Sequence, residues 1–148
     1  MANFIESFNK GLQAADTARA NKEEINSVIE QLSEQLSQAV DGRLKIEIIQ
    51  KNEPIDTFNL SPKDFFSRRT YYAIVASNPL AARYEAQELA RWKVEESGYP
   101  CKVVMPDAEI YCQDKTALEN ALSRLISTPA AGKALQAVMN QPLKPDEE

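Results

Sequence analysis

The first 41 residues, MANFIESFNKGLQAADTARANKEEINSVIEQLSEQLSQAVD (1–41), decide how the rest of the chain is interpreted. Small or apolar residues recur there at steps of three and four, the spacing that keeps one stripe on one side of an α-helix. They are Phe4, Phe8, Gly11, Ala15, Ala18, Ile25, Ile29, Leu32, Leu36 and Ala39, and the polar Lys22 interrupts them. An unbroken helix of this length would be roughly 55–60 Å long, at about 1.5 Å per residue. We therefore predict an N-terminal helical association segment, 1–41.

Two features leave the form of this segment open. Asn21 followed by Glu24 has the pattern of a capping box, so the segment is either one long helix or two helices with a break near residue 21. The positions flanking Ile29 and Leu36 are neutral, whereas a two-stranded coiled coil usually places charges there. The stripe therefore suits a helical bundle or packing on a sheet better than a simple coiled coil.

The apolar stripe has two interpretations, self-association and packing within its own chain. A domain this short offers little surface to cover so long a helix, which favours self-association as a homodimer. The candidate dimer face comprises the larger apolar residues of the stripe: Phe4, Phe8, Ile25, Ile29, Leu32 and Leu36.

The rest of the chain has the pattern of an α/β domain, residues 43–140, followed by a polar tail, 141–148. Alternating or apolar runs predict strands at 43–50, 70–77, 101–105 and 109–112, and capping signals predict helices at 79–97, 116–126 and 129–139. The 79–97 helix would let the next strand run parallel to the preceding one through a crossover. The expected fold is α/β or α+β, with a small, roughly four-stranded mixed sheet and helices on both of its faces.

Composition bounds the class of protein. The 148 residues, 43% of them hydrophobic, fit one domain with an appendage. No apolar run approaches the ~20 residues of a membrane span, and the N-terminus lacks the features of a signal peptide, so we expect a cytoplasmic protein that does not enter a membrane. The net charge of −5 disfavours non-specific binding to nucleic acid, whose affinity depends on Lys and Arg.

The sequence offers few groups for catalysis. It has no histidine, which removes the commonest general base and metal ligand, and it has no glycine-rich phosphate loop. We assign no catalytic, cofactor-binding or metal-binding residue, and we expect no cofactor. Cys101 and Cys112 flank a predicted turn and should face each other across a hairpin, where a reduced pair of small apolar side chains is favoured over a disulfide.

The most specific local motif is FFSRRTYY at 65–72, in which two arginines lie between two aromatic pairs. Such a stretch can contact a protein partner, or it can stack on and neutralise a single-stranded nucleic acid. The simpler alternative is that the tyrosines are strand residues of the core and the arginines are solvated. The candidate partner-binding residues are Phe65, Phe66, Arg68, Arg69 and Tyr71.

These observations favour a non-enzymatic, protein-binding accessory protein, an adaptor, inhibitor or chaperone-like molecule that forms a homodimer through its N-terminal helical region. In size and acidity the chain resembles small bacterial or phage accessory proteins in general, a likeness that assigns no residue. One alternative is a nucleic-acid-associated regulator that uses residues 65–72. A second is a histidine-free enzyme acting on a small molecule.

Overall fold

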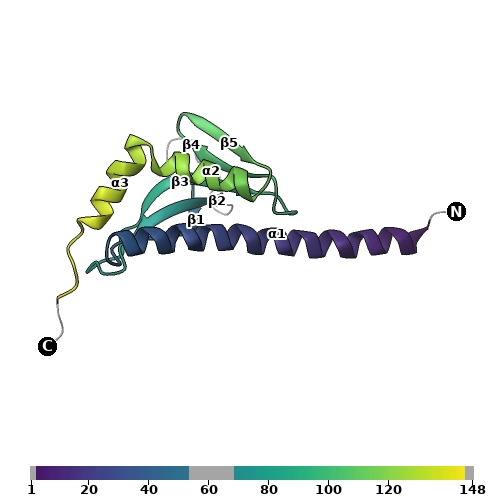
Figure 1. Ribbon diagram of the computed structural model, residues 1–148, viewed down its shortest axis with the longest axis horizontal. Coiled ribbons are helices and arrows are strands. Elements are labelled where there is room, and N and C mark those ends of the chain that lie inside the picture. Colours follow the sequence, from purple (N-terminus) through teal and green to yellow (C-terminus); the bar gives the residue numbers. More distant parts are fainter. Residues whose placement is uncertain (1–2, 54–68, 146–148) are drawn as a thin grey trace, which may run out of the picture.

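The computed structural model describes residues 3–53 and 69–145, which form an α+β fold with one long helix, a five-stranded sheet and two further helices (Figure 1). The elements in chain order are α1 (Phe4–Ala39), β1 (Lys45–Asn52), β2 (Thr70–Ser77), β3 (Gln87–Val94), β4 (Cys101–Met105), β5 (Ala108–Cys112), α2 (Lys115–Ile126) and α3 (Pro129–Met139). The prediction of an α+β fold is confirmed, with five strands where roughly four were expected.

Helix α1 runs without a break for 36 residues, so the interpretation of two helices is wrong. Asn21 does not cap a second helix; its side-chain amide instead donates a hydrogen bond to the carbonyl of Ser97, at 3.0 Å. The helix begins after Asn3, whose side chain accepts from the backbone N–H of Glu6. It ends just before Asp41 and Gly42, which both adopt the left-handed conformation expected at a helix C-terminus.

The sheet has the strand order β1-β2-β3-β4-β5, and every neighbouring pair is antiparallel. The expected mixed sheet is therefore wrong. A parallel pair needs a long crossover connection, and the segment that was expected to supply it is itself a strand. Strand β2, with apolar residues on both of its faces, lies inside the sheet between β1 and β3.

The predicted helix at 79–97 is the main error of the sequence interpretation. Residues 79–86 are irregular, and β3 follows them as a strand that pairs with both β2 and β4. Within β3, Ala90 and Trp92 are buried while Lys93 is exposed, a two-residue alternation hidden among strong helix formers. A bulge opposite Ile74 and Val75 adds Leu89 to the buried side.

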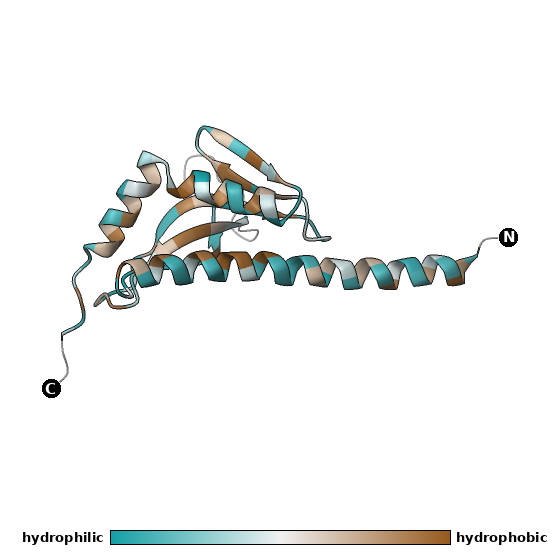
Figure 2. Cartoon of the chain, in the orientation of Figure 1, coloured by the Kyte–Doolittle hydropathy of each residue, from teal (hydrophilic) through white to brown (hydrophobic). Residues whose placement is uncertain are grey.

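The hydrophobic core joins one face of the sheet to all three helices. Ile46, Ile74 and Trp92 from the sheet share a single cluster with buried residues of α1, α2 and α3. Ala73 and Val75, which point to the opposite face, are also buried but do not belong to this cluster. Within the described ranges the helices thus cover one face, whereas helices were expected on both faces. Figure 2 shows the hydrophobic residues of α1 gathered where it passes the sheet, with further ones near its free end.

The two C-terminal helices begin at capping residues of the expected chemistry. The Asp114 side chain accepts from the N–H of Ala117 at the start of α2, and the Thr128 side chain accepts from the N–H of Ala131 at the start of α3. Leu118, Ala121, Leu122 and Leu125 then place the apolar stripe of α2 in the core. Ala131 and Val138 do the same for α3, so both helices pack through an apolar stripe.

Candidate interaction surface on helix α1

Helix α1 divides into two parts with different surroundings. We call residues 4–20 the projecting half and residues 21–39 the docked half. Figure 1 shows the projecting half extending past the sheet, away from the other helices. Every residue from 4 to 17 is exposed, and Ala18 is the first that is half-buried. At about 1.5 Å per residue the projecting half is about 26 Å long.

The projecting half carries large apolar side chains in water. Phe4 is 79% exposed, Ile5 75%, Phe8 64% and Leu12 51%. Steps of three, four and seven residues place these four on neighbouring positions of one side of the helix. A cluster of large exposed apolar side chains on one element is typical of an interaction surface.

The docked half is held to the sheet by both apolar and polar contacts. Ile25, Val28 and Ile29 are each at most 6% exposed and belong to the core cluster. The Tyr99 hydroxyl donates a hydrogen bond of 2.8 Å to Glu24. Burial of the ring, together with this bond, raises the pKa of Tyr99 well above its usual range.

The predicted dimer face is therefore divided between the two halves. Ile25 and Ile29 are buried in their own chain, and Leu32 and Leu36 pack partly buried against the same core. Phe4 and Phe8 are the members of that face left accessible to another molecule. The chain thus covers the second part of the stripe itself and leaves the first part uncovered.

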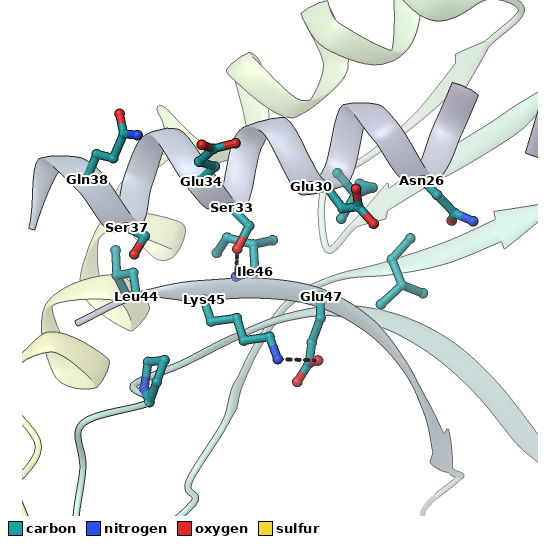
Figure 3. Close-up of a pocket in the computed structure, with 13 residues that line it drawn as sticks. Asn26, Glu30, Ser33, Glu34, Ser37, Gln38, Leu44, Lys45, Ile46 and Glu47 are labelled. Atoms are coloured by element: carbon teal, nitrogen blue, oxygen red, sulfur yellow. Dashed lines mark hydrogen bonds and ion pairs between the residues drawn. The ribbon is translucent and has the colours of Figure 1, made fainter. Parts of the chain in front are cut away.

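A groove of about 540 Å³ runs between the docked half and strand β1 (Figure 3). Its α1 side is mostly polar, with Asn26, Glu30, Ser33, Glu34 and Ser37. Its other lining residues include the apolar Leu44, Ile46, Ile48 and Pro79, with Ile29 from the helix. The Ser33 hydroxyl accepts a hydrogen bond of 2.9 Å from the N–H of Ile46, a donor on the open edge of β1. This bond satisfies an edge group that would otherwise need water or another strand.

A second hollow lies between the projecting half and the turn that joins β3 to β4. Gly11, Ala14, Ala15 and Ala18 face Glu95, Glu96, Ser97 and Pro100 across about 660 Å³. Small side chains on the helix and a connecting turn on the sheet leave this space open. In the same turn Gly98 approaches α1 closely, and a Cβ added to it would lie 2.6 Å from the Cβ of Asn21.

Tyr71, one of the candidate partner-binding residues, belongs to a polar network on the sheet. Its hydroxyl donates to Glu88 at 2.7 Å, which raises the pKa of Tyr71, and the guanidinium of Arg91 lies 4.0 Å from its ring centre. Arg91 also forms a bidentate pair with Glu53, at 2.7 and 3.3 Å. The Tyr71 side chain thus has partners within its own chain, and Tyr72, which the simpler alternative places in the core, is 49% exposed.

The other residues of that motif are less informative. Arg69 is exposed, and its carbonyl accepts from the N–H of Glu53 at 2.8 Å. Phe65, Phe66 and Arg68 lie outside the described residues, as does the short helical turn that Ser61 and Pro62 predicted. The partner-binding interpretation of residues 65–72 stays a prediction.

Cys101 and Cys112 lie directly opposite each other on β4 and β5, as the hairpin prediction required. Both are fully buried and both are free thiols. Burial raises the pKa of the Cys101 thiol to about 12 and also raises that of Cys112. Since the thiolate is the reactive form, both side chains behave as small apolar core residues.

The structure adds no other candidate site of the kinds considered. Across residues 3–53 and 69–145, no three Cys, Asp or Glu side chains gather as metal ligands would. In the same part of the chain, no helix combines the length and apolar character needed to cross a membrane. Comparisons of the chain with protein-family models, with curated proteins and with solved structures found no match.

Sequence reasoning found the apolar stripe of α1 but missed the groove beside it. The groove depends on how far β1 lies from the helix, which periodicity does not report. Ser33 is one of the neutral positions that flank Ile29 and Leu36, and nothing in the sequence indicates that its hydroxyl bonds to the edge of β1. The 3-residue and 4-residue spacing of Ile5, Phe8 and Leu12 was the available signal for a continuous exposed face, and Ile5 and Leu12 were not counted in it.

Proposed function

We propose that this chain is a protein-binding accessory protein that self-associates through the projecting half of α1. The observation that carries the proposal is the set of four large apolar side chains, each more than half exposed, on a helix that extends beyond the core. A binding role is preferred to a catalytic one because the sequence has no histidine and its clearest exposed feature is apolar.

The stability of the projecting half supports a partner. Isolated helices of this length are marginal in water, because the helix nucleus is costly and each residue gains little. Most helical stability in proteins comes from packing of an apolar face. Burying the exposed faces of Phe4, Ile5, Phe8 and Leu12 would contribute roughly 25 cal/mol for each Å² removed from water. A second helix supplies such a surface.

A second copy of the chain is the simplest partner. Homodimers with two-fold symmetry are the commonest oligomers, and a two-fold axis lets both copies bury the same face at once. Helix pairs of this kind pack at interaxial distances of 8–10 Å. The roles of adaptor, inhibitor or chaperone-like protein are compatible with a dimer that presents the rest of its surface to another protein.

Sedimentation velocity over a wide concentration range tests the proposal. The wild-type chain is expected to sediment as a dimer that dissociates on dilution, and Phe8→Gln with Leu12→Gln is expected to be monomeric at the same concentrations. Leu143→Gln is the matched control. The exposed fraction of Leu143, 55%, is similar to the 51% of Leu12, but Leu143 lies near the other end of the chain. Glutamine keeps helix propensity, so the variants isolate the loss of apolar surface.

A wild-type chain that stays monomeric at every concentration would contradict self-association. A dimer that survives Phe8→Gln with Leu12→Gln would place the interface elsewhere. Circular dichroism of each variant checks that the helix content is retained.

A further inference from the structure

We infer that the projecting half of one copy lies antiparallel in the groove between α1 and β1 of a second copy. The inference rests on the proposed self-association and specifies its geometry. Each copy would then supply one helix segment and one groove, so that two identical contacts are formed about a two-fold axis. Because each projecting half and each groove is used once, the assembly closes at two copies and does not extend into a filament.

The exposed side of the projecting half continues into the groove along the same helix. Steps of three and four from Ile5, Phe8 and Leu12 lead through Ala15, Arg19 and Lys22 to Asn26, and further steps lead to Ser33. Asn26 and Ser33 both line the groove. A partner helix that follows this line of positions therefore meets the projecting half and the groove on one continuous side.

The two segments have matching lengths. The projecting half has 17 residues and the docked half 19, or about 26 Å and about 28 Å of helix. Two copies of α1 overlapped along their whole length in antiparallel orientation place each projecting half beside the docked half of the other copy. A parallel overlap would instead place the two projecting halves together and the two grooves together.

Charge favours the antiparallel orientation. The docked half has Lys22 against four glutamates, a net charge of −3, while the projecting half has two basic and two acidic residues. Parallel packing would bring two docked halves of net charge −3 together, and like charges in contact are unfavourable. Antiparallel packing instead brings the neutral half to the acidic one, whose Glu30 and Glu34 border the groove.

The groove has the surface that the projecting half needs. Ile29, Leu44 and Ile46, each at most 6% exposed, form its floor, and the more accessible Ile48 and Pro79 add apolar surface beside the edge strand β1. Ser33 already occupies the Ile46 donor, so an apolar side chain can pack there without leaving that N–H unsatisfied. Figure 3 shows Ser33 and Ser37 on the side of α1 that faces Ile46 on β1 and Leu44 just before it, with the hydrogen bond between Ser33 and Ile46 joining the two elements.

A spin label at residue 9 measures the orientation directly. Asn9 is exposed, and Asn9→Cys supplies the labelled site while Cys101 and Cys112 stay buried and unreactive. Groove docking predicts a distance of about 35–40 Å between the two labels, because the helix ends point in opposite directions. Parallel helices, or pairing of the projecting halves alone, predict less than about 20 Å. The unsubstituted chain, treated with the same label, is the control.

A pair of serine substitutions tests the groove itself. Ser37→Trp fills a position that lines the groove, while Ser27→Trp makes the same change at an exposed position of α1 that does not line it. The dimer dissociation constant is expected to rise at least about tenfold for Ser37→Trp and to stay within about twofold for Ser27→Trp, because one inserted ring occupies the space of the partner's apolar side chains. Thermal unfolding of both variants checks folding.

The outcomes separate this inference from the proposed function. A dimer with a short label distance, or one unaffected by Ser37→Trp, overturns groove docking while self-association stands. A chain that never dimerises overturns both. A dimer with the long distance that is weakened by Ser37→Trp alone supports both.

Discussion

The two halves of α1 share one helix and one spacing of apolar residues but differ in what covers them. The docked half buries Ile25, Val28 and Ile29 against the sheet. In the projecting half, Phe4 is 79% exposed and Phe8 is 64% exposed. Both halves are regular α-helix, so the difference lies in whether another part of the same chain packs against that half. Helical periodicity therefore identifies a face that will be buried, but it does not identify the molecule that buries it.

The largest expected difference between the halves is in the stability lost when a large apolar side chain is replaced by alanine. Ile25→Ala should lower the free energy of unfolding by about 2–4 kcal/mol, because it leaves a cavity at a site only 3% exposed. Phe8→Ala should change it by no more than about 0.5 kcal/mol, as expected of a surface site. Urea unfolding at low protein concentration, where a dimer contributes least, measures both. Equal losses of stability for the two substitutions would contradict the conclusion that only the docked half packs in the core.

A glycine comparison locates the boundary between the halves. Gly98→Ala should cost about 1–3 kcal/mol, because Gly98 has a φ of +91° and an added Cβ would lie 2.6 Å from that of Asn21. Gly11→Ala, in the projecting half, should leave global stability unchanged, since nothing lies within 4 Å of the added atom. Thermal unfolding of the two variants gives the comparison. A destabilised Gly11→Ala would show that the body of the protein covers more of α1.

Tyr99 tests the polar attachment of the docked half through pH. Its raised pKa means that folded Tyr99 keeps its proton to higher pH than the unfolded side chain, whose pKa is 10.0. The folded state then binds more protons, so stability falls as pH rises above about 10. Tyr99→Phe should cost about 0.5–1.5 kcal/mol at neutral pH, through the lost bond to Glu24, and should flatten this decline.

The pH experiment needs the wild-type chain beside the variant at each pH. Cys101 contributes a decline of the same sign from about pH 9 upward, and this part remains in Tyr99→Phe. Only the difference between the two curves reports Tyr99. Parallel curves above pH 10 would mean that the ring is not fixed against α1 in solution.

The smallest effect is expected at the free end of α1. Asn3→Ala removes the side chain that accepts from Glu6, and a lost cap costs a helix about 0.5–2 kcal/mol locally. Amide hydrogen exchange over the first turns should accelerate severalfold, while the free energy of global unfolding stays the same. Exchange in the docked half is the internal control, and a simultaneous acceleration there would show that the two halves open together.

Much of the fold was predictable because most elements follow one local rule. The sequence predicts the strand at 70–77 and the helix at 129–139 with the bounds they have, and capping signals place the start of α2 within one residue. Strand β3 was not predicted, because Asn78-Pro79 and the alanines that follow favour a helix locally. Pairing with strands on both sides outweighs that preference, and pairing partners are not visible in a window of one segment.

The candidate site was predictable only in part, for a related reason. Phe4 and Phe8 were identified as members of a dimer face, and they are exposed as such a face requires. Ile25 and Ile29 were given the same role because the stripe is continuous, and only the position of the sheet separates the two pairs. The groove beside β1 arises from the distance between two elements, which no residue pattern records.

The strand order has a consequence for how the chain matures during synthesis. Each strand pairs with the next one along the chain, so the hairpins can form in the order in which they emerge from the ribosome. Helix α2, which packs beside Val28 of α1 on the same face of the sheet, is made almost last. A nascent chain that has not reached Lys115 still exposes the apolar side of its first helix. Two nascent chains on one messenger RNA can therefore associate through this side before either has finished folding.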